Sequence, residues 1–402
     1  MGVLKKHRIL IFLFSVLLIS CDYKDNEELP EADFVKYIDA QSGDRQISVV
    51  DVKQLSDGSM LVLGNIDVNK PYVLKFSEKG EVIWESKLEG TSYFRAVPEL
   101  IESNGKYYFT CFDNTGENGT ALFEIGEFGG LSFVKILNKV TYTLSTSGLT
   151  GGGMLVQSYD ADGRRTILSR YNARFEEQWR ERYSIYEDLE TPTIYNHVTG
   201  RTQPLPFFCR EKLDGANPTT YYMNGLVNYN FAMSLINSSN GAQTGSVQGN
   251  RYEALISSAT YLGNNQFALS RFIEDGKNYL IPNTQITNTS IIQGTLIEGE
   301  YIPHWEDRSI VSSAKLVIDG QDVVGFVGNT KSGKLELRLY SLTDNSLLGT
   351  TFLGGSNFLG FGKLFQTNDG GVAIVAQTAF EDRFFKLALF KLSPTTLEEL
   401  ID

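Results

Sequence analysis

Histidine and cysteine are scarce in this chain, with three residues of each among 402. Beyond residue 20 only His197 and His304 remain, and they are not spaced as the zinc pair of a His-Glu-x-x-His helix. A Gly-x-Ser-x-Gly nucleophile elbow is also missing. The glycines at 151–153 precede a strand-like run and do not open a helix, so they do not predict a phosphate-binding loop. The sequence therefore predicts no metal site and no cofactor.

Only Cys111 and Cys209 follow the first cysteine, Cys21. Cys111 lies in a strand-like aromatic run at 107–112, and Cys209 is far from it in the sequence. An oxidising compartment would permit a disulfide between them. Free cysteine, however, behaves as a small apolar residue that is usually buried. We therefore expect two buried thiols.

Basic residues are fewer than acidic ones, 36 against 48, which gives a net charge of −12. The leader described below carries Lys5, Lys6 and Arg8 and no acidic residue, so its removal makes the chain more negative still. A charge of this sign repels phosphate backbones and anionic lipid surfaces. Nucleic acid is therefore excluded as a partner.

The first twenty-one residues have the layout of a secretory signal peptide: a basic start, an apolar core at 9–18, and a small residue before Cys21. The apolar core is too short for a transmembrane helix, which needs about 18 or more apolar residues. The ending Leu18-Ile19-Ser20-Cys21 resembles the bacterial lipobox. That resemblance implies that Cys21 is lipidated and that the protein is held to the outer membrane by its acyl chains.

Residues 21–32 are polar and acidic and show no apolar periodicity, which is typical of a flexible tether. The segment resembles the acidic stretch that follows the lipidated cysteine in surface-exported lipoproteins of Bacteroidota. It can equally be a solvated spacer without an export role. We therefore divide the chain into a signal peptide at 1–20, a tether at 21–32 and one domain at 33–402.

The domain is built from a repeat of short strands. Its first copy has a Ser-Asp-Gly-Ser turn at 56–59, an apolar strand at 60–64, and two further strand-like runs at 72–76 and 82–88. Tight turns rich in Gly, Asp and Asn separate these runs, which is typical of a β-meander. No segment shows a sustained helical period of apolar residues.

The hairpin recurs seven times at intervals of about fifty residues, as expected for β-propeller blades of four strands. We predict an all-β chain with a single propeller of seven four-stranded blades; six or eight blades are the nearest alternatives. The fifth copy is the weakest, because Pro282 interrupts its hairpin. The hairpins begin near Tyr72, Ala121, Thr166, Phe231, Tyr279, Leu335 and Lys386.

Residues 54–64 with 72–84, and again 366–376, resemble the propeller repeats of bacterial envelope proteins, with blades of the WD or quinoprotein type. The match is close in the first and last repeats and degenerate between them. This resemblance implies a fold and an envelope location. It transfers no catalytic residue, because the family includes binding, assembly and enzymatic proteins.

Two details follow from the repeat. Trp84 and Trp179 occupy matching late positions in their copies, which favours packing between adjacent blades over ligand stacking. The strand-like residues 33–38 precede the first repeat. We expect them to pair into the last blade and close the ring, which would remove an exposed edge strand; a short ordered part of the tether is the alternative.

Two segments are candidates for a binding surface. The step from the third to the fourth hairpin is the longest and predicts an insertion at about 186–223, and the connection at 300–308 contains the only tryptophan outside the repeat position. Both connections follow an outer strand, so we expect them on one propeller face. The alternative is that these aromatic residues plug the channel or pack beneath the loops. Candidate stacking residues are Trp305, Tyr195, Tyr221 and Tyr222, and candidate polar contacts are Arg210, His304 and His197.

The sequence therefore favours a non-catalytic binding or scaffold module that presents a propeller face to a glycan, a peptide or a partner envelope protein. The first alternative is a carbohydrate-active hydrolase or lyase, because Asp and Glu are plentiful and their proximity cannot be deduced from spacing. The second is a subunit of a secretion or assembly complex that uses the blade rims.

Overall fold

The computed structural model describes most of the chain, and the predicted signal peptide and tether, including Cys21, lie outside the described residues. Residues from Phe34 to Asp402 form one compact unit. The described ranges are 33–38, 47–67, 69–114, 119–184, 190–199, 205–215, 218–227, 230–248, 253–273, 275–287, 291–293, 299–355, 358–380 and 384–402.

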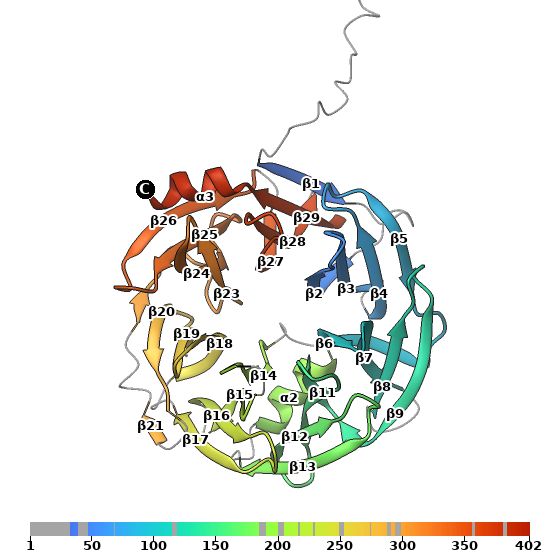
Figure 1. Cartoon of the computed structure of the whole chain (residues 1–402). Helices are drawn as coiled ribbons and strands as arrows, with labels where there is room; N and C mark the ends of the chain where they lie inside the picture. Colours follow the sequence, from blue (N-terminus) through green and yellow to red (C-terminus); the bar gives the residue numbers. More distant parts are fainter. Residues whose placement is uncertain are drawn as a thin grey trace, which may run out of the picture. The chain divides into compact units, whose positions relative to one another are not determined.

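Seven sheets, six of them purely antiparallel, surround a central axis (Figure 1), which confirms the predicted propeller of seven blades. From the axis outward, blade 1 contains β2 (Ile47–Gln54), β3 (Met60–Ile66), β4 (Lys70–Phe76) and β5 (Val82–Lys87). Blade 2 contains β6 (Tyr93–Ser103), β7 (Lys106–Asp113), β8 (Gly119–Ile125) and β9 (Leu131–Thr141). Blade 3 contains β10 (Thr143–Gly148), β11 (Met154–Asp160), β12 (Arg165–Tyr171) and β13 (Glu177–Ser184).

Blade 4 gains a fifth strand from the sequence of blade 5. Blade 4 contains β14 (Cys209–Lys212), β15 (Thr220–Val227), β16 (Asn230–Asn237) and β17 (Gln243–Gln248). Blade 5 contains β18 (Glu253–Gly263), β19 (Gln266–Ile273), β20 (Asn278–Gln285) and β22 (Glu300–Tyr301). Between β20 and β22 the chain crosses to blade 4, where β21 (Ile291–Gln293) pairs in parallel with β17 as a fifth strand.

Blade 5 is the irregular copy, as its sequence predicted. Pro282 lies in β20 where the pairing with β19 shifts, between the pairs Phe267↔Thr284 and Leu269↔Ile281. A proline cannot donate a ladder hydrogen bond, so a register shift is the position that tolerates it. The outer strand of this blade is reduced to two residues, Glu300 and Tyr301.

The last blade closes the ring with strands from both ends of the propeller sequence. Blade 6 contains β23 (Ser312–Ile318), β24 (Gln321–Asn329), β25 (Leu335–Ser341) and β26 (Leu347–Leu353). Blade 7 contains β27 (Phe358–Gln366), β28 (Val372–Phe380), β29 (Phe384–Leu392) and β1 (Phe34–Ile38). The antiparallel pairing of β1 with β29 confirms the predicted closure.

The closing strand also packs against blade 1. The turn between β4 and β5 places Gly80 at φ 78°, and a Cβ there would lie 2.6 Å from Lys36 Cγ of β1. Only glycine combines this positive φ with such a close approach. Behind the turn, Ile38 joins a buried apolar cluster shared by blades 1 and 7.

The two repeat-position tryptophans join neighbouring blades, as predicted. The Trp84 indole N–H donates to Glu127 O at 3.0 Å, and a Cβ on Gly129 would lie 2.8 Å from the indole ring. Trp179 makes the equivalent bond from blade 3 to Ser238 O in blade 4, also at 3.0 Å. Each indole therefore lies against the outer hairpin turn of the following blade.

Both cysteines are free and buried, which confirms that prediction. Cys111 belongs to the apolar cluster between blades 1 and 2, and Cys209 to the cluster between blades 3 and 4. Burial raises the pKa of the Cys209 thiol to about 12, although the Ser145 hydroxyl, which donates to the sulfur at 3.5 Å, opposes this shift. Both thiols are therefore packing residues.

The predicted insertion at about 186–223 is partly wrong. Its second half forms β14 and the start of β15, so Arg210, Tyr221 and Tyr222 are strand residues of blade 4 and not loop residues. Strand β14 was not predicted, because four residues are too few to show an alternating pattern. The additional chain between β13 and β14 contains α2 (Glu190–Thr199), a helix that the sequence pattern did not predict.

A second unpredicted helix, α3 (Pro394–Ile401), follows β29 and lies on the outer rim beside β26 (Figure 1). Ser393 caps its start by accepting a bond from Thr396 N at 3.2 Å, and proline occupies the first helical position. At eight residues it is too short for a detectable apolar period. Among the described residues, no helix is long and apolar enough to cross a membrane.

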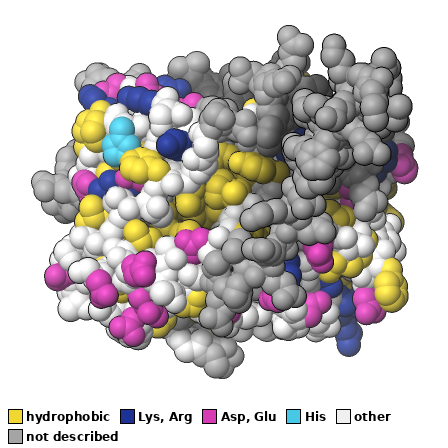
Figure 2. Space-filling model, turned by 90° about the horizontal axis from the view of Figure 1, so that it is seen from above, with side chains coloured by type: hydrophobic (Ala, Val, Ile, Leu, Met, Phe, Trp, Pro, Cys, Tyr) yellow, Lys and Arg dark blue, Asp and Glu magenta, His cyan; other side chains and the backbone are white. Residues whose placement is uncertain are grey.

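The outer strands leave some apolar side chains exposed, including Ile83 of β5, Phe133 of β9 and Phe352 of β26. In the turned view of Figure 2, hydrophobic side chains gather in the middle of the visible face, and Asp and Glu side chains are more numerous at its lower left. Outer strands are covered on one side only, so mixed polarity is expected there.

Replacing Ile38 with alanine is expected to lower the free energy of unfolding by about 2–5 kcal/mol, because it opens a cavity under the closing strand. The exposed neighbour Val35 on the same strand provides the control, and its replacement with alanine should change stability by less than about 0.5 kcal/mol. Urea unfolding measures both variants. Equal effects would contradict the assignment of β1 as the closing strand.

Candidate functional site

A cavity of about 710 Å³ opens along the propeller axis. Its walls are the first halves of the innermost strands, together with the segment that contains α2 and the connection at 306–311. Both segments that the sequence singled out therefore border one cavity, as expected for connections on a single propeller face. The volume lies in the range of small-molecule sites, about 300–1,000 Å³.

A second cavity of about 720 Å³ lies at the opposite ends of the innermost strands. Its lining includes the turns after β6 and β10, at Gly105 and Gly152. Four charged residues line both cavities and so mark the waist between them: Asp51, Glu99, Arg210 and Lys363.

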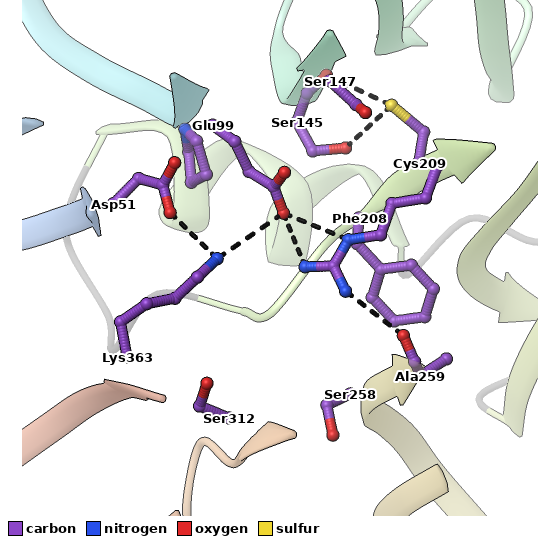
Figure 3. Close-up of polar contacts among 12 residues, drawn as sticks. Asp51, Glu99, Ser145, Ser147, Phe208, Cys209, Ser258, Ala259, Ser312 and Lys363 are labelled. Atoms are coloured by element: carbon purple, nitrogen blue, oxygen red, sulfur yellow. Dashed lines mark hydrogen bonds and ion pairs between the residues drawn. The ribbon is translucent and has the colours of Figure 1, made fainter. Parts of the chain in front are cut away.

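These four residues form one chain of ion pairs (Figure 3), hereafter the axial charge cluster. Lys363 Nζ of β27 lies 2.9 Å from Asp51 Oδ1 of β2 and 3.9 Å from Glu99 Oε1 of β6. Glu99 Oε1 also accepts bonds from Arg210 of β14, from Nη2 at 2.5 Å and from Nε at 3.1 Å. The cluster thus joins blades 7, 1, 2 and 4 across the axis and carries no net charge.

The pairing keeps Glu99, Lys363 and Arg210 ionised. Burial would raise the pKa of Glu99, but the charges of Arg210 and Lys363 outweigh it and hold the pKa below its ordinary value. Burial would lower the pKa of Lys363, but Asp51 and Glu99 reverse that effect and raise it. The pKa of Arg210 is raised in the same way, because Glu99 outweighs the effect of burial.

Hydroxyl and amide groups line the wall beside the axial charge cluster. Ser258 of β18 and Ser312 of β23 face the cavity, and Ser312 Oγ accepts the backbone N–H of Leu364 at 3.0 Å. Asn329 of β24 also lines the cavity, and its buried Oδ1 has no hydrogen-bond partner in the described part of the chain. This oxygen is buried, so it lies beneath the cavity surface.

Arg95 fixes α2 above the channel. Its guanidinium donates to the carbonyl oxygens of His197 and Val198 in the last turn of the helix, to Val198 O at 2.8 Å. A cation at this end satisfies free carbonyls and complements the helix dipole. Ile194 and Val198 of α2 pack into an apolar cluster over blades 2 and 3. The helix is therefore a fixed wall of the cavity.

His197 has a structural environment, although it lines the cavity. Its Nδ1 accepts the backbone N–H of Leu205 at 2.8 Å, and its ring meets Phe207 edge-on with centroids 5.1 Å apart. Burial, with a contribution from the charge of Arg95, lowers the pKa of His197 to about 3. The ring is neutral at physiological pH and holds the chain that follows α2.

The connection between β22 and β23 is anchored on both neighbouring blades. Asn278 Nδ2 of blade 5 donates to Glu306 O at 2.7 Å, and Glu306 N donates to Asn329 O of blade 6 at 2.8 Å. Ser309 Oγ accepts the Asn329 N–H at 3.0 Å. These bonds fix the opposite wall of the cavity.

Trp305 of this connection is buried, with 1% of its surface exposed. Its indole N–H donates to Glu336 Oε2 at 2.5 Å, and Gly328 leaves room for the ring, since a Cβ there would lie 2.6 Å from it. His304 Nε2 lies 2.6 Å from the same carboxylate oxygen, and Arg338 Nη1 lies 3.0 Å from the other. Trp305 therefore packs blade 5 against blade 6.

The predicted stacking residues are not brought together in the cavity. Trp305, Tyr221 and Tyr222 are buried in the core, so the alternative that they serve packing is correct for these three residues. Tyr195 is exposed on α2 but does not line the cavity, and His304 is exposed beside Glu336. Of the predicted polar contacts, Arg210 and His197 line the cavity.

Sequence reasoning missed Asp51, Glu99 and Lys363. Each is a charged residue inside the innermost strand of its repeat, where the neighbouring residues are mostly apolar. Charged side chains are rarely buried unless they are paired. A single charged residue in the otherwise apolar first strand of several repeats could therefore have predicted that these charges pair at the axis.

No protein-family model matches the chain, and no curated protein sequence matches it. Among the described residues, no group of three or more His, Cys, Asp or Glu side chains is placed to hold a metal ion.

Solved structures show likeness at the level of the fold, and the chain is a seven-bladed β-propeller. A streptogramin B lyase is 12% identical over 89% of this chain and 97% of its own, with a TM-score of 0.48. The propeller domain of the Trilobed protease from Pyrococcus furiosus is 10% identical over 90% and 96%, with 0.47. A europium-containing methanol dehydrogenase is 10% identical over 84% and 89%, with 0.41. These neighbours have different activities, so the likeness carries no function.

Replacing Trp305 with alanine is expected to lower the free energy of unfolding by about 3–5 kcal/mol, because a buried ring and a buried hydrogen bond are both lost. Replacing Phe128, which is 87% exposed in the turn after β8, with alanine should change it by less than about 0.5 kcal/mol. Denaturant unfolding monitored by circular dichroism compares the two. A stable Trp305 variant would restore this residue as a candidate ligand contact.

The neutral state of His197 predicts a loss of stability in acid. Its pKa is about 3 in the folded chain and about 6.5 when unfolded, so below pH 6.5 the unfolded state binds the additional proton. Stability should fall by up to about 1.4 kcal/mol per pH unit between pH 6.5 and 3. Unfolding curves of the wild type and His197→Asn, which keeps an acceptor, should diverge over this range. Parallel pH profiles would contradict the assignment.

Proposed function

We propose that this protein is a non-catalytic binding protein of the bacterial envelope that holds a small glycan-derived ligand in the cavity on the α2 face. The observation that carries the proposal is the cavity of about 710 Å³, which is walled by fixed segments and floored by charged groups. Sites of this kind combine apolar walls with a few placed polar groups.

The composition of the wall supports a ligand rich in hydroxyl groups. Serine hydroxyls and asparagine amides can both donate and accept hydrogen bonds, as sugar hydroxyls do. Ser257, Ser258, Ser309, Ser312 and Asn329 all line the cavity. Phe207 and Phe208 add apolar surface on the side of α2.

The axial charge cluster speaks against Glu99 as the acid of a glycoside hydrolase at this site. A glycosidase needs one carboxylic acid with a raised pKa to protonate the leaving group. The pKa of Glu99 is instead held below its ordinary value by Arg210 and Lys363, which outweigh the effect of burial. A carboxylate paired with two cations is a weak base and is not protonated at neutral pH.

The envelope location rests on the sequence. The leader and the Leu18-Ile19-Ser20-Cys21 ending support lipidation of Cys21 and attachment to the outer membrane, and the acidic segment that follows supports a place on the cell surface. An anchored binding protein of this kind would capture ligands close to the membrane.

The test uses the full-length protein purified in detergent and titrated calorimetrically with a panel of neutral, acidic and amino mono- and disaccharides. Ile310→Trp narrows the cavity, because Ile310 is half-buried in its wall. Val317→Trp is the matched control, since Val317 is exposed in the same blade and does not line the cavity. At least one saccharide should bind, and Ile310→Trp should weaken it tenfold or more while Val317→Trp should not.

Two results would contradict the proposal. One is saccharide binding that a stably folded Ile310→Trp variant retains in full, which would place the site elsewhere. The other is release of a product from any bound saccharide, detected by mass spectrometry, which would make the protein an enzyme.

A further inference from the structure

Both cations of the axial charge cluster carry N–H groups that have no partner among the described residues. An arginine carries five N–H groups. Those of Arg210 donate to Glu99 twice and to Ala259 O at 3.2 Å, and the Tyr222 hydroxyl is close enough to engage a fourth. Lys363 Nζ has three N–H groups and, within the described chain, a single partner closer than 3.9 Å, namely Asp51. At least one N–H of each cation remains for a ligand.

Three of the four carboxylate oxygens of the cluster are also engaged within the described chain. Glu99 Oε1 receives two bonds from Arg210 and the attraction of Lys363. Asp51 Oδ2 accepts the backbone N–H of Leu100 at 2.8 Å, and Asp51 is 4% exposed. The positive ends of the cluster are therefore better placed than the negative ends to receive a new partner.

Figure 3 shows how the Lys363 ammonium lies relative to the cavity wall. In that view the Lys363 ammonium lies between the carboxylates of Asp51 and Glu99 on one side and the hydroxyls of Ser258 and Ser312 on the other. Ser312 Oγ accepts from Leu364 N, so its own hydrogen is available to donate. All of these groups line the same cavity.

We infer that this cavity takes a small polyhydroxylated carboxylate, the class to which uronic acids belong. Its carboxylate binds Lys363, Arg210 and the Ser312 hydroxyl, and its hydroxyl groups bond to the serine hydroxyls of the cavity wall. Charge-assisted bonds of this type are stronger than neutral ones. The inference rests on the proposed function and specifies the ligand of that same site.

The neutral charge of the cluster shapes this recognition. Because its two positive and two negative charges cancel, it does not attract anions over a long range, and selection depends on contact geometry. A neutral sugar lacks the charge-assisted bonds, and an amino sugar places a cation against Lys363 and Arg210. The order of affinity should therefore be acidic, then neutral, then amino sugar.

The experiment titrates the full-length protein in detergent with D-glucuronate, D-glucose and D-glucosamine, which share one ring and differ in charge. Glucuronate should bind at least tenfold more tightly than glucose, and its affinity should fall as salt is raised. Binding of glucosamine should be weaker than that of glucose.

A paired substitution isolates the lysine without leaving a buried charge alone. Asp51→Asn with Lys363→Gln removes one positive and one negative group together, and the preference for glucuronate over glucose should drop below threefold. The matched control is Lys315→Gln with Asp322→Asn, an exposed pair 3.0 Å apart that does not line the cavity. Thermal unfolding confirms that both double variants are folded.

The outcomes separate this inference from the proposed function. If glucose or glucosamine binds as tightly as glucuronate and Ile310→Trp weakens that binding, the acidic class is wrong and the cavity remains a saccharide site. If glucuronate binds but the Asp51 and Lys363 double variant keeps its full preference, the assigned contacts are wrong. If no saccharide of the wider panel binds, both proposals fail.

Discussion

The innermost strand of every blade is paired on one edge only, and its other edge faces the axis. Backbone groups there cannot be left unpaired in a narrow channel, because an unsatisfied buried N–H costs about 1–3 kcal/mol. Neighbouring blades supply the partners: Asp51 accepts Leu100 N, Thr146 accepts Glu99 N at 3.1 Å, and Ser312 accepts Leu364 N. This requirement explains why polar side chains are concentrated near the axis.

The axial charge cluster lies in the same region near the axis, and its side chains also find their partners on other blades. A buried ion pair seldom adds net stability, because the cost of removing two charges from water offsets their attraction. Its effect on specificity can be larger, since only one relative placement of blades 7, 1, 2 and 4 lets Asp51, Lys363, Glu99 and Arg210 pair. We regard the cluster as a device that sets this placement and, through its spare donors, shapes the ligand site.

The sequence predicted the parts of the fold that repeat. Each third strand was found, because a strand-like run recurs at intervals of about fifty residues, and the matching positions of Trp84 and Trp179 revealed how blades meet. Helix α2 and strand β14 were not found. Both are short. The helix is also stabilised by Arg95, which is distant in sequence, so the residues of the helix alone do not predict it.

The site was predictable only in outline. The two connections were expected on one face because of their place in the repeat, and both border the cavity. The aromatic residues were misjudged, since composition does not distinguish a tyrosine in a loop from one in an eight-residue strand such as β15. The charges were overlooked because pairing across four blades leaves no local pattern around Asp51 or Lys363.

The pairing of β1 with β29 has a consequence for the order in which the blades of the ring form. The first strand of the propeller, which begins at Phe34, pairs with residues more than 300 positions later in the chain, at Lys391. Until β29 is in place, β1 is an unpaired edge strand, and β2 lacks the apolar contacts that blade 7 provides. The ring thus closes only after β29 is available, and a chain truncated before β29 would leave β1 and the last blade unpaired.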